Sequence, residues 1–379
     1  METSRTDGSR VVMWELTRAC KLGCAHCPAG AQPRRSPLEL STYEAYKTID
    51  QIVSLNPDEV IVTGGDPLER PDLYQIVDYA RRRGLHLSLT VSPTPSLTGA
   101  AIGKLKRNGL SRLILSLDSP TPERHDAARG IGGQFGSTLL AIRWARTAEL
   151  PIEVNTLLSA SNRGDLPVIA ELLGDVDVSR WNIYFLVPLG AARHADAVTS
   201  AEVEEVFETL FQLSRRVPFP IRTFEAPHYR RFVLQKAVEE RQRSIDDYFD
   251  TGATGIRIGD DTGHQSVAVN NYVYISHTGE VSISPFLPLT AGNVRYQPLS
   301  TIYRYGELFN TVRDEVNLKG KCALCEFKSV CGGSRARAFA ITGDLFATDP
   351  LCTYQPGTFL PVAPTIVPES AASGGGGAA

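Results

Sequence analysis

The sequence lacks both a long hydrophobic run and an excess of charge of either sign. No apolar stretch approaches the roughly 18 residues that a membrane span needs, and the polar start METSRTDGSR contains no apolar core of a signal peptide. Lysine and arginine number 39 against 42 aspartates and glutamates, so the formal net charge is −3. This balance gives no support to the binding of nucleic acid or of a membrane surface. We therefore expect a cytoplasmic protein, and 379 residues suit two domains at ~150 residues each.

Cysteine is scarce and confined to two short regions. The chain contains seven cysteines, three near its start and four near its end, with none between the two groups. A reducing cytosol disfavours disulfides, so clustered thiols are better interpreted as metal ligands or catalytic groups. The first group is Cys20, Cys24 and Cys27, and the second is Cys322, Cys325, Cys331 and Cys352.

Short apolar runs alternate with longer amphipathic segments from residue 11 to residue 217. DEVIVTG is strand-like, for example, and PDLYQIVDYARRRG is typical of a helix with proline near its start and glycine after its end. Six such strand–helix pairs predict an α/β fold, a parallel sheet covered by helices. Because a closed barrel has eight pairs, we expect an open partial barrel or a doubly wound sheet, with the chemistry at the C-terminal ends of the strands.

The remainder of the chain follows other patterns. We interpret residues 1–10 as a flexible N-terminus, 11–217 as the barrel, and 218–265 as a bridging segment with a helical centre. Residues 266–355 alternate around a predicted hairpin turn at HTGE and end in the four-cysteine region, which predicts a small α+β domain. Residues 356–379 end in SGGGGAA, which is typical of a flexible tail.

The first three cysteines lie on a loop directly after the first predicted strand. A closed tetrahedral metal site has four ligands, so this group is one ligand short. Three thiolates can hold three irons of a cubane cluster and leave the fourth iron open to an exogenous ligand. The alternatives are zinc with a fourth ligand from elsewhere in the chain and thiols without any metal. His26 lies between two of the cysteines and is too constrained to be a good fourth ligand.

The spacing Cys-x3-Cys-x2-Cys after a first strand resembles the signature of the radical S-adenosylmethionine (SAM) superfamily. That family often has an aromatic residue before the third cysteine, a place that His26 takes here. The resemblance implies a partial (β/α)6 barrel and a 4Fe–4S cluster on Cys20, Cys24 and Cys27. It also implies that SAM chelates the open iron, and that one electron cleaves SAM to a 5′-deoxyadenosyl radical that abstracts a substrate hydrogen. A flavodoxin- or ferredoxin-type electron donor is implied by the same chemistry.

A second signal is VTGGDP, at the end of the second predicted strand. Glycine lets the backbone approach a ligand closely, and in the superfamily this segment, usually ending Gly-Gly-Glu-Pro, contacts the amino group of SAM. Asp66 replaces that glutamate here. Later strand ends carry further candidates, each of which would alone also suit a helix cap or a loop hydrogen bond. The SAM-binding residues that the resemblance implies are Gly64, Gly65, Asp66, Ser92, Ser116, Asp118, Arg129, Asn155 and Val187.

The C-terminal cysteines occur in CALCEFKSVCGG and, after a further gap, at Cys352. Four thiols close a site for zinc or for a fully ligated 4Fe–4S cluster. A zinc ribbon would more often have two Cys-x2-Cys pairs. The segment resembles a reduced SPASM or twitch extension of radical SAM maturases, and CGGSRARAFAITGDLFATDPLC is similar to the group of haem-forming decarboxylases and haem d1 synthesis proteins. The resemblance implies one auxiliary 4Fe–4S cluster. Arg335 and Arg337 beside it suit either a substrate carboxylate or an ordinary solvated basic face.

Three further residues are candidates for proton exchange with a substrate. His228 and Tyr229 in RTFEAPHYRRF, and His277 in SHTGE, carry groups that can transfer protons; a helix start with satisfied surface side chains is the alternative. The predicted function is a radical SAM oxidoreductase or lyase that oxidises or decarboxylates a tetrapyrrole-like cofactor precursor or a peptide. The alternatives are a ribosomal-peptide maturase, an enzyme that modifies a carbohydrate or nucleoside, and a zinc-stabilised binding protein without activity.

Overall fold

The structure is a computed structural model. It describes residues 10–189, 192, 194–241 and 272–359. The flexible ends predicted at the two termini, and the second half of the predicted bridging segment, lie largely outside the described residues.

One sheet of ten strands organises the described part of the chain, in the order β10-β9-β8-β1-β2-β3-β4-β5-β6-β7. Neighbouring strands from β8 through β1 to β7 are parallel, whereas β9 and β10 pair in antiparallel fashion. The strands are β1 Val11–Glu15, β2 Glu59–Thr63, β3 Leu87–Thr90, β4 Arg112–Ser116, β5 Ile152–Leu158, β6 Arg180–Phe185, β7 Ile221–Phe224, β8 Tyr272–Ile275, β9 Glu280–Ser282 and β10 Gly292–Asn293.

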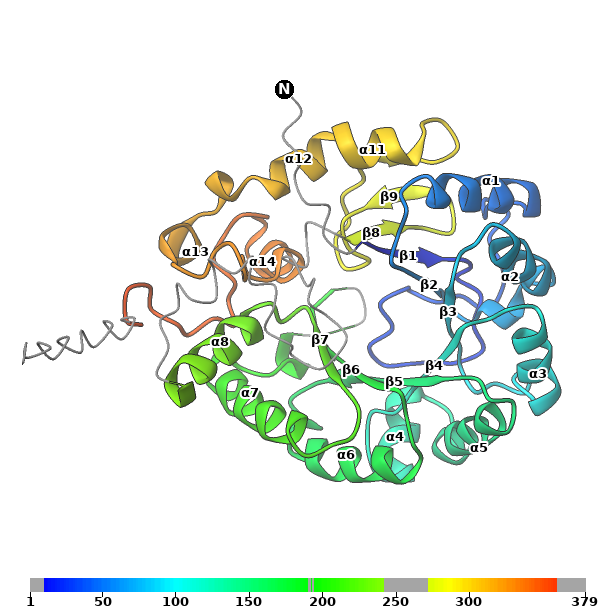
Figure 1. Ribbon diagram of the computed structural model, residues 1–379, viewed down its shortest axis with the longest axis horizontal. Coiled ribbons are helices and arrows are strands. Elements are labelled where there is room, and N and C mark those ends of the chain that lie inside the picture. Colours follow the sequence, from blue (N-terminus) through cyan, green and yellow to red (C-terminus); the bar gives the residue numbers. More distant parts are fainter. Residues whose placement is uncertain (1–9, 190–191, 193, 242–271, 360–379) are drawn as a thin grey trace, which may run out of the picture.

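Helices lie around the outside of the curved sheet, and the four-cysteine region lies beyond the end of the sheet near α8 (Figure 1). The α-helices are α1 Thr42–Val53, α2 Leu73–Arg82, α3 Gly99–Arg107, α4 Pro122–Arg129, α5 Gln134–Thr147, α6 Leu166–Asp175, α7 Ser200–Ser214, α8 His228–Arg241, α11 Leu299–Tyr305, α12 Glu307–Arg313, α13 Gly320–Leu324 and α14 Arg335–Thr342. Short 3₁₀ turns are η1 Pro67–Glu69, η2 Arg163–Asp165, η3 His194–Asp196 and η4 Glu315–Asn317.

The predicted parallel α/β fold is confirmed, and its six predicted strands correspond to β1–β6. The sheet extends further at both ends. β7 lies in the segment interpreted as a bridge, where a strand of four residues is too short to show a clear alternation. β8 pairs with β1, with Val273 beside Val12, so the sheet crosses the boundary predicted at residue 266.

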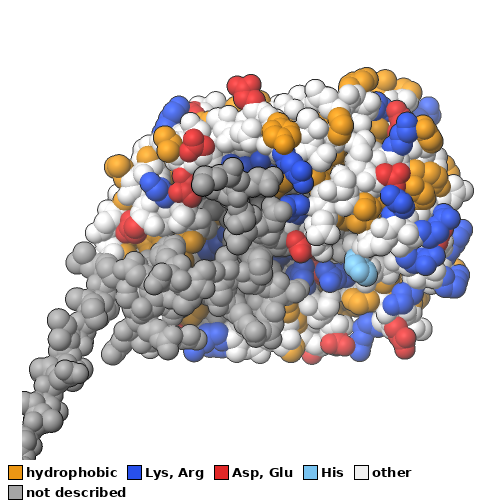
Figure 2. All heavy atoms as spheres, turned by 45° about the horizontal axis from the view of Figure 1, so that its top comes forward, with side chains coloured by type: hydrophobic (Ala, Val, Ile, Leu, Met, Phe, Trp, Pro, Cys, Tyr) orange, Lys and Arg blue, Asp and Glu red, His pale blue; other side chains and the backbone are white. Residues whose placement is uncertain are grey.

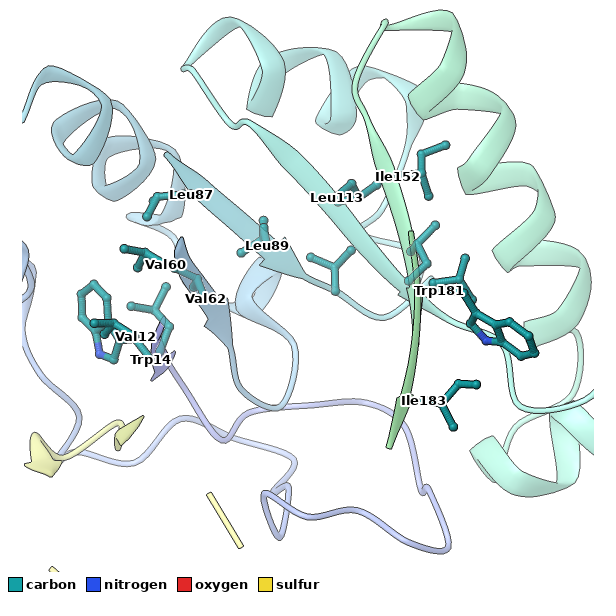
Figure 3. Close-up of a cluster of buried hydrophobic side chains, with 14 of the residues drawn as sticks. Val12, Trp14, Val60, Val62, Leu87, Leu89, Leu113, Ile152, Trp181 and Ile183 are labelled. Atoms are coloured by element: carbon teal, nitrogen blue, oxygen red, sulfur yellow. The ribbon is translucent and has the colours of Figure 1, made fainter. Parts of the chain in front are cut away.

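Alternation along the strands separates two apolar clusters, because successive side chains point to opposite faces of a sheet. Val12 and Trp14 of β1 pack with Val60 and Val62 of β2 in the large core beneath the helices (Figure 3). Met13 points to the other face and belongs to a small separate cluster inside the barrel. One face of the sheet therefore forms the core, and the other face lines the interior of the barrel.

Arg70 fixes both ends of the loop between β1 and α1. Its side chain is 2% exposed and forms a fork with Asp72, with Nε–Oδ1 at 2.9 Å and Nη2–Oδ2 at 2.6 Å. Its Nη1 donates to the carbonyl oxygens of Leu16 at 3.2 Å and Leu40 at 2.9 Å. Leu16 precedes the three-cysteine loop and Leu40 follows it, so one buried guanidinium sets the spacing of the loop ends.

The surface carries both signs of charge. In Figure 2, Lys and Arg side chains are interspersed with Asp and Glu over the described part of one face. Among the helices that the structure describes, none has both the length and the apolar content that a membrane span requires.

Arg70→Leu is expected to lower the free energy of unfolding by about 3–5 kcal/mol, because Asp72 would stay buried without its partner. Chemical denaturation followed by circular dichroism measures this change. Arg82→Leu, on the exposed end of α2, should leave stability nearly unchanged because its ion pair with Asp78 is solvated. An Arg70→Leu protein as stable as the wild type would contradict the proposed clamp.

Candidate functional site

A cavity of about 300 Å³ opens at the C-terminal ends of the parallel strands. Its walls come from the three-cysteine loop and from the ends of β1 to β6 and β8, the edge at which such folds place their chemistry. The structure brings eleven of the predicted cofactor residues to this cavity: Cys20, Cys24, Cys27, Gly64, Gly65, Ser92, Ser116, Asp118, Arg129, Asn155 and Val187.

Asp66 does not line the cavity, although it belongs to the same predicted motif. It is fully buried, and its carboxylate accepts hydrogen bonds from the Leu68 amide at 3.2 Å and the Thr94 hydroxyl at 2.9 Å. Burial raises the pKa of Asp66 to about 6. The side chain therefore holds the turn after β2, and only its neighbours Gly64 and Gly65 face the cavity.

Close backbone contacts join that turn to the three-cysteine loop. The Gly65 amide donates to the Thr17 carbonyl at 2.7 Å, and the Asp66 amide donates to the Ala19 carbonyl at 2.7 Å. A Cβ atom at Gly65 would overlap the backbone of Ala19, with the Ala19 carbonyl carbon 2.7 Å away. Glycine is therefore required at Gly65 for the turn to lie directly against the residue before Cys20.

Two thiols of the first group lie in surroundings that disfavour the thiolate when no metal is bound. Burial raises the pKa of both the Cys20 and the Cys24 thiol. Within the described residues, no three His, Cys, Asp or Glu side chains converge on a point where a single metal ion would sit. A cluster in which each iron takes one thiolate needs no such convergence, so three thiols bordering one cavity fit a 4Fe–4S cluster.

Arg129 lies beside these thiols at the end of α4. Its Nη1 is 4.0 Å from the Cys24 sulfur, and its Nη2 forms an ion pair with Asp118. Asp118 also accepts a hydrogen bond from the Leu157 amide at 2.8 Å, which fixes its carboxylate. Asp118 already neutralises Arg129, so the predicted contact of Arg129 with a SAM carboxylate would have to share or replace this ion pair.

His26 lines the cavity in the place where the family often has an aromatic residue. Its Nε2 lies 3.1 Å from Asp196 Oδ2, in the η3 turn after β6. The pair joins the cysteine loop to the segment that follows β6. It fixes the imidazole ring without making it a metal ligand.

The structure does not bring His228 and Tyr229 to the cavity. Both are buried in the first turn of α8, where their rings pack against Phe207 of α7. Burial lowers the pKa of His228 to about 3 and raises that of Tyr229 above its usual value. The predicted proton exchange with a substrate therefore does not match their position, because the helix that carries them is packed beneath α7.

His277 lies behind the cavity wall. Its Nδ1 is 2.6 Å from one oxygen of Glu15, and Tyr274 donates to the other oxygen at 2.8 Å. Burial raises the pKa of Glu15, but the hydrogen bond from His277 and the charge of Arg18 outweigh it, so the net pKa is lowered. Glu15 and Tyr274 line the cavity, whereas His277 orients Glu15 from behind.

Glu15 and Tyr274 line the cavity but are not among the residues predicted from the sequence. Glu15 is the last residue of β1, so the strand-end rule that selected Ser92 and Ser116 would have found it. Tyr274 had no comparable signal, because its contact with Glu15 joins residues 259 positions apart in the sequence.

The four C-terminal cysteines border a second cavity, next to Gly332, Gly333 and Tyr354. Burial raises the pKa of the Cys325 thiol to about 11 and that of the Cys331 thiol further. These thiols ionise at neutral pH only when a metal replaces their protons. Four half-buried cysteines at the border of one cavity fit a fully ligated 4Fe–4S cluster, in which each iron takes one thiolate.

Arg335 and Arg337 are not solvated, and neither lines the main cavity. Both are buried, since α14 begins beneath the loop that carries Cys352. Arg337 pairs with Asp349, with Nη1–Oδ2 at 3.1 Å, and also donates to the Glu225 carbonyl oxygen. Arg335 points its Nη2 at the Cys322 sulfur.

Residues 14–173 match the sequence pattern of the radical SAM superfamily. The AdoMet-dependent heme synthase of Methanosarcina barkeri (strain Fusaro) is 34% identical over 358 residues, which cover 93% of this chain and 98% of that protein. The AdoMet-dependent heme synthase of Nitratidesulfovibrio vulgaris (strain Hildenborough) is 36% identical over 360 residues, 94% and 96% of the two chains. The PqqA peptide cyclase of Rhodopseudomonas palustris is 27% identical over 349 residues, 91% and 87%.

Solved structures share the fold at low sequence identity. Streptococcus suis SuiB bound to S-adenosylmethionine has a TM-score of 0.70 and 14% identity, over 92% of this chain and 78% of that chain. Native anSMEcpe with bound AdoMet has a TM-score of 0.66 and 12% identity, over 90% and 93%. At these identities, the likeness shows the fold alone.

Gly65→Ala is expected to remove most of the iron bound by the first three cysteines, because the added methyl group would overlap the Ala19 backbone. Iron and acid-labile sulfide per chain, determined on anaerobically purified protein, measure the loss. Gly136→Ala is the matched control, since no atom lies within 4 Å of a Cβ placed there on α5. Wild-type iron content in Gly65→Ala would show that the close backbone approach is not needed.

Proposed function

The chain belongs to the radical SAM superfamily and is an enzyme of that family, and we propose that its substrate is a tetrapyrrole-type cofactor precursor with carboxylate side chains. One observation carries this proposal. Proteins named AdoMet-dependent heme synthase are 34% to 36% identical over nearly the whole chain. The proteins named PqqA peptide cyclase reach 26% to 28%.

The family implies a 4Fe–4S cluster and SAM. We assign the cluster to Cys20, Cys24 and Cys27, and SAM to the adjoining cavity. When bound, this pair supplies a radical that abstracts a hydrogen atom from the substrate. In this assignment the Gly64–Gly65 backbone lies against SAM, while Arg129 and Asp118 meet its polar end.

The rest of the cavity suits the flat face of an aromatic macrocycle. Met13 and Ile61 form its apolar floor, and Phe286 lies in its wall. Tyr184 faces the same space and is held by a parallel stack on Phe224, with ring centroids 4.2 Å apart. Rigid aromatic and aliphatic side chains favour a large planar ligand.

The proposed reaction is the oxidative decarboxylation of a –CH₂–CH₂–COO⁻ side chain. The carbon next to the ring loses one hydrogen atom, and the side chain then loses carbon dioxide and one electron to become a vinyl group. SAM, one electron and that hydrogen atom yield methionine and 5′-deoxyadenosine. The reaction needs an acceptor for the released electron and no protein base, because the carboxylate enters in its ionised form.

We assign the acceptor to an auxiliary 4Fe–4S cluster on Cys322, Cys325, Cys331 and Cys352. Their sulfurs border one cavity next to α14, which supports a closed site. An external donor of the flavodoxin or ferredoxin type would supply the electron that cleaves SAM.

Anaerobic turnover with SAM and dithionite tests this proposal. An iron porphyrin with four propionate side chains should accelerate 5′-deoxyadenosine formation. At least one ionised propionate should become a vinyl group by loss of carbon dioxide and one hydrogen atom, as detected by liquid chromatography–mass spectrometry. The Cys24→Ala variant should form neither product. Acceleration by a glutamate- and tyrosine-containing peptide instead, with no change in the porphyrin, would favour the peptide-maturase alternative and overturn the tetrapyrrole assignment.

A further inference from the structure

Arg335 is held rigidly beside the second cysteine group. It is 3% exposed at the start of α14. Its Nε donates to the Gly333 carbonyl at 3.3 Å, and its Nη1 donates to the carbonyls of Leu345 at 3.0 Å and Ala347 at 2.8 Å. The remaining arm, Nη2, points at the Cys322 sulfur at 3.9 Å.

Gly333 leaves room for this arm. A Cβ atom at Gly333 would lie 2.5 Å from Arg335 Nη2 and 3.5 Å from the Cys322 sulfur. The backbone at Gly333 also has a φ of +69°, a conformation that favours glycine. The turn after Cys331 is therefore shaped so that a guanidinium reaches a cysteine ligand.

The charge of Arg335 has no carboxylate partner. Across the ranges that the structure describes, no aspartate or glutamate forms an ion pair with it, whereas Arg337 next along the helix pairs with Asp349. Asp344 is half-exposed and pairs with Lys319 at 2.6 Å. The hydrogen bond with Lys319 is the main cause of the lowered pKa of Asp344, and the charge of Arg335 adds only a smaller effect. A buried cation without an anion is strongly unfavourable, and the group that faces Arg335 is the Cys322 sulfur.

We propose that Arg335 is the counter-charge of the auxiliary cluster and raises the reduction potential of that cluster, so that the cluster accepts the electron released by the substrate. This inference rests on the proposed function. Reduction adds one negative charge to the cluster, so a fixed positive charge and an N–H···S contact stabilise the reduced state more than the oxidised state. The substrate radical loses one electron and the cluster gains it; a ferredoxin-type carrier then re-oxidises the cluster.

The first cysteine group provides an internal comparison. There too a guanidinium approaches a ligand sulfur, with Arg129 Nη1 4.0 Å from Cys24, but Asp118 neutralises that guanidinium. The two sites thus share an arginine–sulfur contact. They differ in that Asp118 pairs with the arginine that contacts the sulfur, whereas Asp349 at the second site pairs with Arg337 and not with Arg335. The same difference predicts a lower potential at the first cluster, which must reduce SAM, than at the second.

A short chain of contacts joins the second site to the main cavity. Ser334, directly before Arg335, donates to one carboxylate oxygen of Glu225, and the Ser284 hydroxyl donates to the other at 3.1 Å. Ser284 is followed by Pro285 and Phe286, which line the cavity. The turn that carries Cys331 is therefore coupled to the wall against which a substrate would lie.

Redox titration of the holoenzyme, followed by electron paramagnetic resonance, tests the inference. Arg335→Gln should shift the midpoint potential of the auxiliary cluster to more negative values and leave that of the first cluster unchanged. Arg335→Lys, which keeps the charge, should shift it less. Arg304→Gln, the same charge change on the exposed side of α11, should shift neither cluster.

The outcomes separate this inference from the proposed function. Wild-type protein with roughly four irons, rather than the roughly eight of two cubanes, would overturn the auxiliary cluster itself. Eight irons in Arg335→Gln with both potentials unchanged would overturn only the role of Arg335. If Arg335→Gln loses the second cluster, Arg335→Lys decides: a retained cluster supports the counter-charge, and loss there too would show that packing rather than charge holds the site.

Discussion

The fork between Arg70 and Asp72 is the constraint on which the site depends. The three cysteines lie on a loop of irregular backbone, and irregular backbone keeps a ligand geometry only when its ends are fixed. Arg70 holds the carbonyls of Leu16 and Leu40, one at each end of the loop, and its own charge is neutralised by Asp72. With the base of the loop closed, the turn at Gly65 can lie directly against Ala19, the residue before its first cysteine. The position of the three cysteines at the cavity thus depends on the buried Arg70–Asp72 ion pair, although neither residue lines the cavity.

Much of this arrangement could be predicted from the sequence because it is local. Short apolar runs between amphipathic segments predicted β1 to β6. The cysteine spacing and the paired glycines lay where parallel strands end. The rest depends on contacts between distant segments. β8 reaches the cavity only because it pairs with β1, which brings Tyr274 to Glu15. His228 has the composition of a site residue, yet α7 covers it. No local pattern distinguishes such a buried residue from a catalytic one.

The environment of Arg335 likewise could not be predicted from the local sequence. In the sequence, the segment SRAR has the composition of an exposed basic turn. Its burial is possible only because carbonyls at Leu345 and Ala347, on the far side of α14, accept its hydrogen bonds. Both carbonyls accept from Nη1, and the Gly333 carbonyl accepts from Nε, so two arms of the guanidinium are hydrogen-bonded while its charge has no carboxylate partner. An unpaired charge beside a thiol is a feature of tertiary structure, and it is this feature that separates the second cysteine site from the first.

The cavity itself favours redox chemistry over acid–base chemistry. Each carboxylate, imidazole and guanidinium in its described lining has a charged or hydrogen-bonded partner: Glu15 with His277 and Tyr274, Asp118 with Arg129, His26 with Asp196, and Arg124 with Asp165. A group engaged in this way positions a ligand well but is a poor base, since taking up a proton would break its pair. When an ionised carboxylate leaves as carbon dioxide, the reaction needs only an electron acceptor. Forming a cross-link in a peptide also requires the removal of a proton from the substrate. The paired lining is therefore better suited to the proposed decarboxylation. That reaction then depends on electron transfer from the cavity to the second cysteine site.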